Sequence, residues 1–133
     1  MDHTETARKL AFFETLNTVC WVTLDISWFF HARLPAVVFA VPTILTCLAI
    51  IRYTERTAAS LLVSGAVAFW AIFNVFWVMG DLEILTWGLE AAKVFIALLV
   101  ACLIGALVDA AFSTEARATV LARLRRFRFG VPK

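Results

Sequence analysis

The chain has 133 residues, of which 62% are hydrophobic and 17% charged, and its mean hydropathy is +0.88. One soluble core of this size could not bury so much apolar surface. The composition therefore excludes an ordinary soluble domain and predicts an all-α integral membrane protein. The formal net charge is only +2, and the distribution of basic residues fits membrane orientation, so no nucleic-acid partner is expected.

Four segments are long and apolar enough to cross a bilayer, which takes about 20 residues in a helix. The first contains Glu14 and Asp25 as its only charges, the next two are almost free of charge, and the last carries its charges near its start. Short turns between the first and second and between the third and fourth predict two antiparallel hairpins. We expect one transmembrane four-helix bundle over residues 1–110, with helices at about 10–31, 34–52, 57–80 and 82–108.

The basic residues gather on one side of this arrangement. Arg8 and Lys9 precede the first helix, Arg52 and Arg56 lie between the second and third, and six more follow the fourth. The opposite side has only Arg33 in its two turns. By the positive-inside rule both termini are predicted to be cytoplasmic, in a membrane of the bacterial inner (plasma) type.

The tail, residues 111–133, is rich in arginine, unlike the apolar segments before it. From Ser113 onward apolar residues recur at helical spacing between arginines, which predicts a basic amphipathic helix lying on anionic lipid headgroups. A plain basic tail that stops translocation is the alternative. The candidate membrane-surface residues are Arg117, Arg123, Arg125, Arg126 and Arg128.

One pattern, W-x-x-x-[D/N]-x-x-W, occurs twice in apolar sequence, at residues 21–28 and 70–77. Positions i, i+4 and i+7 share a helix face, so each copy places a carboxylate or an amide between two indoles. The two copies are either an internal duplication or a coincidence. The residues concerned are Trp21, Asp25, Trp28, Trp70, Asn74 and Trp77.

Asp25 is the residue that most needs an explanation, because a carboxylate in a membrane helix costs about 2.5–3.5 kcal/mol on insertion scales. Counting about 1.5 Å per residue from the outer turns places Asp25, Asn74 and Glu90 at one depth, with Lys93 one turn deeper and able to pair with Glu90. Asp25 then shares Lys93, takes up a proton, or meets a cation or water.

Two functions remain open at this point. Indoles around a carboxylate suit a cation, so the first hypothesis is binding or transport of a small cationic or proton-coupled solute through a polar layer in the outer half of the membrane. The alternative is a non-enzymatic accessory or scaffolding subunit. One small bundle is narrow for transport, so a homo-oligomer or a larger membrane-protein partner is expected.

Enzymatic chemistry has little support in the sequence. It contains no Cys/His cluster with metal-ligand spacing, no phosphate-binding loop and no nucleophile with a neighbouring base. We therefore expect no metal and no cofactor, and we favour a protein that is not an enzyme. Cys20, Cys47 and Cys102 lie in predicted helices and are interpreted as packing residues.

Overall fold

A computed structural model of the chain describes residues 3–114, 117–118 and 120–122. It confirms the all-α prediction, since these residues form four long helices and no strand. The helices are α1 (His3–Phe29), α2 (Arg33–Tyr53), α3 (Ala58–Asp81) and α4 (Gly88–Phe112).

Three of these helices, α2, α3 and α4, are long and apolar enough to cross a membrane. By length and composition these three helices are compatible with a membrane protein. Helix α1 has 27 residues, enough for a span, but Glu14, Asn17 and Asp25 interrupt its apolar residues.

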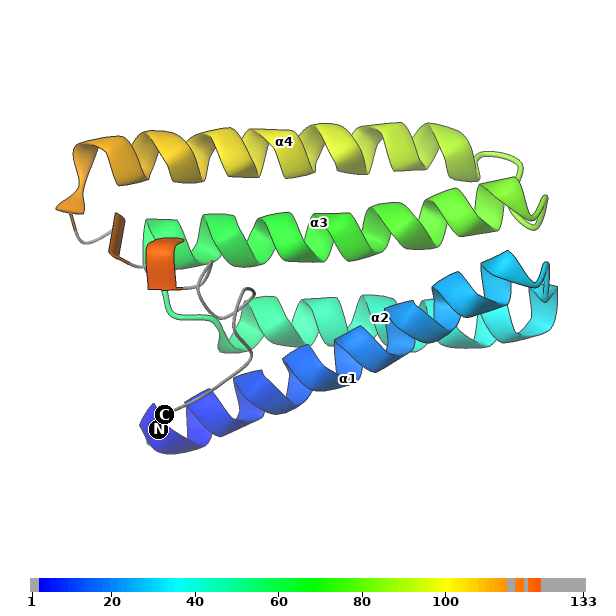
Figure 1. Cartoon of the computed structure of the whole chain (residues 1–133), viewed down its shortest axis with the longest axis horizontal. Helices are drawn as coiled ribbons and strands as arrows, with labels where there is room; N and C mark the ends of the chain where they lie inside the picture. Colours follow the sequence, from blue (N-terminus) through cyan, green and yellow to red (C-terminus); the bar gives the residue numbers. More distant parts are fainter. Residues whose placement is uncertain (1–2, 115–116, 119, 123–133) are drawn as a thin grey trace.

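The helices pack in chain order (Figure 1). Helix α1 crosses α2 obliquely, α2 lies beside α3, and α3 lies beside α4, with a smaller contact between α1 and α3. Within the described residues α4 approaches neither α1 nor α2. The four helices thus form two antiparallel hairpins in a layer, with α4 at one edge, and do not close into a bundle. Both hairpin turns lie at the same end of the molecule (Figure 1).

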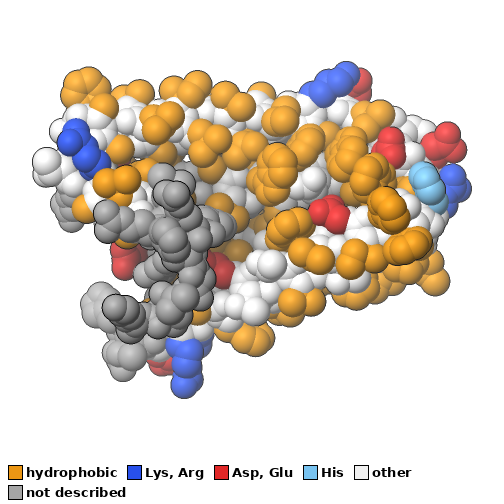
Figure 2. Space-filling model, viewed as in Figure 1, with side chains coloured by type: hydrophobic (Ala, Val, Ile, Leu, Met, Phe, Trp, Pro, Cys, Tyr) orange, Lys and Arg blue, Asp and Glu red, His pale blue; other side chains and the backbone are white. Residues whose placement is uncertain are grey.

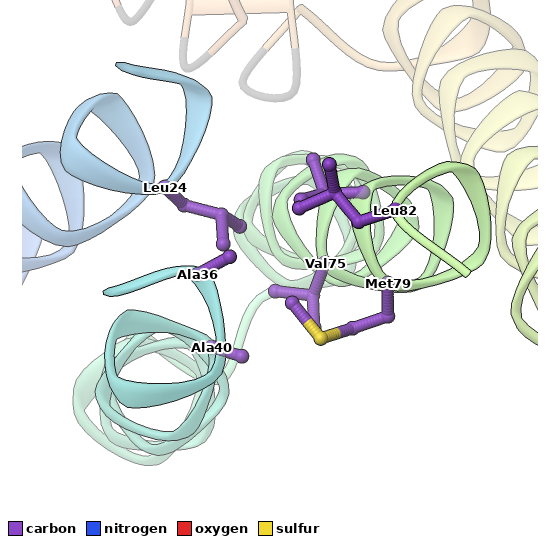
Figure 3. Close-up of a cluster of buried hydrophobic side chains, with 7 residues drawn as sticks. Leu24, Ala36, Ala40, Val75, Met79 and Leu82 are labelled. Atoms are coloured by element: carbon purple, nitrogen blue, oxygen red, sulfur yellow. The ribbon is translucent and has the colours of Figure 1, made fainter. Parts of the chain in front are cut away.

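The main apolar core lies near these two turns. Leu24 of α1 and Val78 of α3 are fully buried there, and small residues on α2 let the three helices approach closely. Figure 3 shows side chains from all three helices pointing toward one another. The buried cluster consists of Leu24, Ala36, Ala40, Val75, Val78, Met79 and Leu82.

Both turns end their helix with the same local structure. His31 and Glu83 have φ angles of 50° and 56°, in the left-handed region. After α1, the Ala32 amide donates to the Ser27 carbonyl at 2.8 Å and the His31 amide to Trp28 at 2.9 Å. After α3, Ile84 donates to Met79 at 2.9 Å and Glu83 to Gly80 at 3.1 Å. These pairs of bonds define Schellman motifs, which reverse the chain directly.

The second turn is longer than predicted. Helix α4 begins at Gly88, whereas the sequence predicted a start near residue 82. The turn is fixed by a close approach of the two helix backbones, because a Cβ atom on Gly88 would lie 2.7 Å from the Gly80 nitrogen and from the Phe76 carbonyl oxygen. Only glycine fits where backbones approach this closely.

Hydrophobic side chains are spread over the described part of the face that Figure 2 shows. Large hydrophobic side chains on α2 and α4, such as Leu45, Val94 and Leu107, are more than half exposed. A soluble monomer rarely shows so much contiguous apolar surface, and this surface is what lipid would cover.

Candidate functional site

The candidate site is an open groove of about 470 Å³ on the side of α1. Seven of its lining residues come from the last turns of α1 and the residue that follows, and one comes from α3. It is lined by Trp21, Val22, Asp25, Ile26, Trp28, Phe29, Phe30 and Trp77. All of these are apolar or aromatic except Asp25.

Asp25 is half-buried in this groove, and its carboxylate makes no hydrogen bond or ion pair with the residues that the structure describes. Figure 2 shows acidic side chains set among hydrophobic ones on the face formed by α1 and α3. Burial removes part of the water around this carboxylate, and no described residue donates a hydrogen bond in its place. A nearby cation would therefore stabilise the charge.

Two indoles form one wall of the groove. The rings of Trp28 and Trp77 have their centroids 4.7 Å apart and are tilted by 46°. The Trp77 ring also stacks on Phe73 at 6.5 Å. The Trp28 indole N–H donates to the Asp81 carboxylate at 2.7 Å. The wall is therefore held from α3 by both ring packing and a hydrogen bond.

Of the Trp, Asp and Asn residues that define the two copies of the pattern, the ones that meet are the last of each copy, Trp28 and Trp77. In the second copy Asn74 is buried, and its amide donates to the Trp70 carbonyl at 3.0 Å within the same helix. The Trp70 ring is 45% exposed and lies 5.5 Å from Phe73. Neither Trp70 nor Asn74 lines the groove with Asp25, so the second copy contributes Trp77 alone.

Glu90 and Lys93 belong to α4 and do not line the groove. They form an ion pair at 2.6 Å, with their side chains 73% and 69% exposed on α4. Because α4 does not approach α1 in the described residues, the option that Asp25 shares Lys93 does not hold. The predicted polar layer is thus divided between a groove on α1 and a pair on α4.

A buried polar cluster joins α1 to α2 below the groove. The Asn17 amide nitrogen lies 2.7 Å from the Thr46 hydroxyl, 3.1 Å from the Thr43 carbonyl and 3.2 Å from the Cys47 sulfur. Asn17 shares a face with Asp25, a local pattern that sequence can show, but its partners on α2 could not be identified without the tertiary structure. The Asn17 amide is thus already bonded to α2, and the cluster holds the two helices together.

Other candidate residues lie at the far end of the chain. The Arg117 guanidinium Nε donates to the Ala110 carbonyl at 3.3 Å, near the end of α4, where a cation offsets the unpaired helix carbonyls. Arg123, Arg125, Arg126 and Arg128 lie outside the described residues, as does most of the predicted amphipathic helix.

The described residues contain no group of three or more His, Cys, Asp and Glu side chains that could hold a metal ion. Cys20 and Cys47 are buried free thiols, and Cys102 is half-buried. Comparison with protein-family models, with curated proteins and with solved structures gave no significant match. The groove around Asp25 is therefore the feature of the molecule that bears on its function.

Proposed function

We propose that α1 crosses the membrane together with α2, α3 and α4, so that the protein spans it four times with both termini in the cytoplasm. Support comes from the packing of α1 along α2 and from the position of the charges. Arg8, Lys9, Arg52 and Arg56 belong to the end of the hairpins opposite the two Schellman turns. The positive-inside rule assigns that end to the cytoplasm, as in a bacterial inner membrane.

We further propose that the groove binds a small organic cation through Asp25. The observation that carries this proposal is a half-buried carboxylate that has no partner among the described residues and shares one groove with Trp21, Trp28 and Trp77. Cation–π contact contributes about 0.5–2 kcal/mol per ring, more where water is excluded. A single carboxylate offers too few oxygens for Ca²⁺ or Mg²⁺, which favours a monovalent cation with an apolar body.

A proton competes with such a cation for the same carboxylate, and this exchange is the basis for proton-coupled binding. Transport across the membrane requires more than one chain, because the groove is open along one side and, within the described part of the chain, only α3 covers α4. A homo-oligomer would provide the missing walls. The basic tail would hold the cytoplasmic face against anionic lipid headgroups.

The test uses the whole protein in lipid nanodiscs and the cation benzyltrimethylammonium, followed by quenching of tryptophan fluorescence. Asp25→Asn should keep the helical content and weaken binding about tenfold or more, since a charge-assisted contact is lost. Asp109→Asn is the matched control, because it makes the same change on α4, away from the groove.

Neopentylbenzene, the uncharged analogue with the same shape, distinguishes cation recognition from simple apolar partitioning. It should bind wild type and Asp25→Asn equally weakly. Equal binding of benzyltrimethylammonium by wild type and Asp25→Asn would overturn the proposal.

The alternative function, an accessory subunit of a larger membrane complex, has one specific observation in its favour. Among the helices that the structure describes, α4 packs on α3 alone, and the residues buried along it are Gly88, Ala92 and Ala106. An exposed edge helix suits docking to another membrane protein as well as contact with lipid. The mass of the gently solubilised particle separates the two functions, since a particle containing a second kind of protein favours the subunit.

A further inference from the structure

Asp81 stands out at the end of α3. It is the last residue of that helix, where the helix dipole disfavours a negative charge, and the last turn contains no basic residue. Its carboxylate links the two hairpins, because it accepts a hydrogen bond of 2.7 Å from the Trp28 indole on α1.

The Trp28 ring is the point at which this bond affects the groove. The ring lines the groove with Asp25 and packs against Trp77 at 4.7 Å. An indole has a single N–H donor, which must point at its acceptor. The position of the acceptor therefore restricts the orientation of the ring. A tryptophan in the wall of an open groove could otherwise take several rotamers.

We propose that Asp81 is a positioning residue, which orients the Trp28 indole so that its face is turned toward the cation beside Asp25. This inference rests on the proposed function for its effect on binding, but the orientation of the ring can be measured without any ligand. Asp81 itself does not line the groove, so its effect is transmitted through Trp28.

The ligand-free readout is the exciton couplet that two close, tilted indoles produce in circular dichroism. The signal of this pair is isolated as the difference between wild type and Trp28→Phe. Asp81→Ala, which removes the acceptor at an exposed helix end, should abolish the couplet and leave the helical content unchanged. Asp81→Asn should restore it, because the amide oxygen still accepts the bond.

Arg33→Met is the matched control for the loss of a contact between the hairpins. It breaks the exposed Arg33–Glu83 ion pair, whose atoms are 3.5 Å apart, without touching an indole, and should leave the couplet intact. Persistence of the couplet in Asp81→Ala would overturn the proposal, and so would its loss in Asp81→Asn, since an uncharged acceptor would then not suffice.

Binding of benzyltrimethylammonium gives the second measurement. Asp81→Ala should weaken it about fivefold, as expected for the loss of one hydrogen bond, and Asp81→Asn should bind like wild type. In the background of Trp28→Phe, which lacks the donor, Asp81→Ala should have no further effect. An additive effect would overturn the inference. If wild type binds no cation, the proposed function fails, and the couplet still decides the role of Asp81.

Discussion

Asn17 is the residue whose contacts most directly hold α1 on α2. It is 3% exposed, and its amide contacts the Thr43 carbonyl, the Thr46 hydroxyl and the Cys47 sulfur. Because Thr46 also donates within its own helix to the Pro42 carbonyl at 2.7 Å, removal of Asn17 leaves that hydroxyl satisfied. The cost should therefore be the bond itself and not an orphaned buried group.

We expect Asn17→Leu to lower the free energy of unfolding by about 1 kcal/mol, within the range for hydrogen bonds between membrane helices. Titration of the protein in mixed micelles with a denaturing detergent measures this value. Thr18→Ala is the control on the next residue, because the exposed Thr18 hydroxyl bonds only to the Glu14 carbonyl of its own helix. Equal stability of Asn17→Leu and wild type would show that the cluster contributes nothing to α1–α2 packing.

For single residues, the sequence predicts which side chains share a face of the same helix. The spacing of Trp21, Asp25 and Trp28 predicts one shared face, and all three residues line the groove. The direction in which Asn74 turns depends on how α3 is rotated against its neighbours, which no local spacing determines. The amide consequently lies buried beside Trp70, although its position in the repeated pattern matches that of Asp25.

The α3–α4 hairpin is the element whose geometry depends most clearly on single residues. At its turn end Gly80 and Gly88 meet backbone to backbone, and a Cβ on either would lie 2.7 Å from a backbone nitrogen of the other helix. Farther along, a Cβ on Gly105 would lie 3.2 Å from Leu62 Cδ2, the far end of a flexible side chain. The first contact cannot relax without separating the helices, but the second can.

Gly88→Ala should therefore destabilise the protein by about 1–3 kcal/mol, as overpacking does. Gly105→Ala should change stability by less than about 1 kcal/mol, because the gain in helix propensity offsets a small shift of Leu62. Thermal unfolding in nanodiscs, followed by circular dichroism, compares the two variants. A Gly88→Ala protein as stable as Gly105→Ala would mean that the hairpin can open at its turn without cost.

The same turn explains why the start of α4 was predicted too early. Residues 82–87 are mostly apolar, with Leu82 buried in the core at 3% exposure and Ile84 and Leu85 packed against it. An apolar run of this kind reads as the first turns of a membrane helix. Only the left-handed conformation of Glu83 and the backbone contact at Gly88 show that the chain reverses there.

For the whole molecule, hydropathy identifies helices but not their neighbours. Lipid tails are as apolar as the side chains of a membrane helix, so no hydrophobic driving force moves an apolar helix face from lipid to protein. The composition of α4 therefore says little about which of its sides packs against another helix. The sequence therefore supports four helices in two hairpins, whereas the open layer with α4 at its edge follows from tertiary contacts. Small residues such as Gly65 and Gly105 mark the α3–α4 interface.

For the whole layer, the side of the membrane on which the N-terminus lies depends on whether α1 crosses the bilayer. If it does, the N-terminus lies on the same side as the Arg52–Arg56 turn. If α1 instead lies along the outer surface, the N-terminus is outside while the other three spans are unchanged. A reporter fused before Met1 thus separates the two arrangements, since α2, α3 and α4 orient the rest of the chain in either case.

We expect a fluorescent protein that matures only in the cytoplasm to report when it is fused before Met1, inserted between Arg52 and Arg56, or fused after Lys133. An enzyme reporter that is active only outside should report from the turn after Gly80. The physical reason is the concentration of basic residues at one end of both hairpins, against Arg33 alone in the two turns at the other. A signal from outside for the N-terminal fusion, with the other three as expected, would leave three spans and place the groove of Asp25 at the membrane surface instead of within the bilayer.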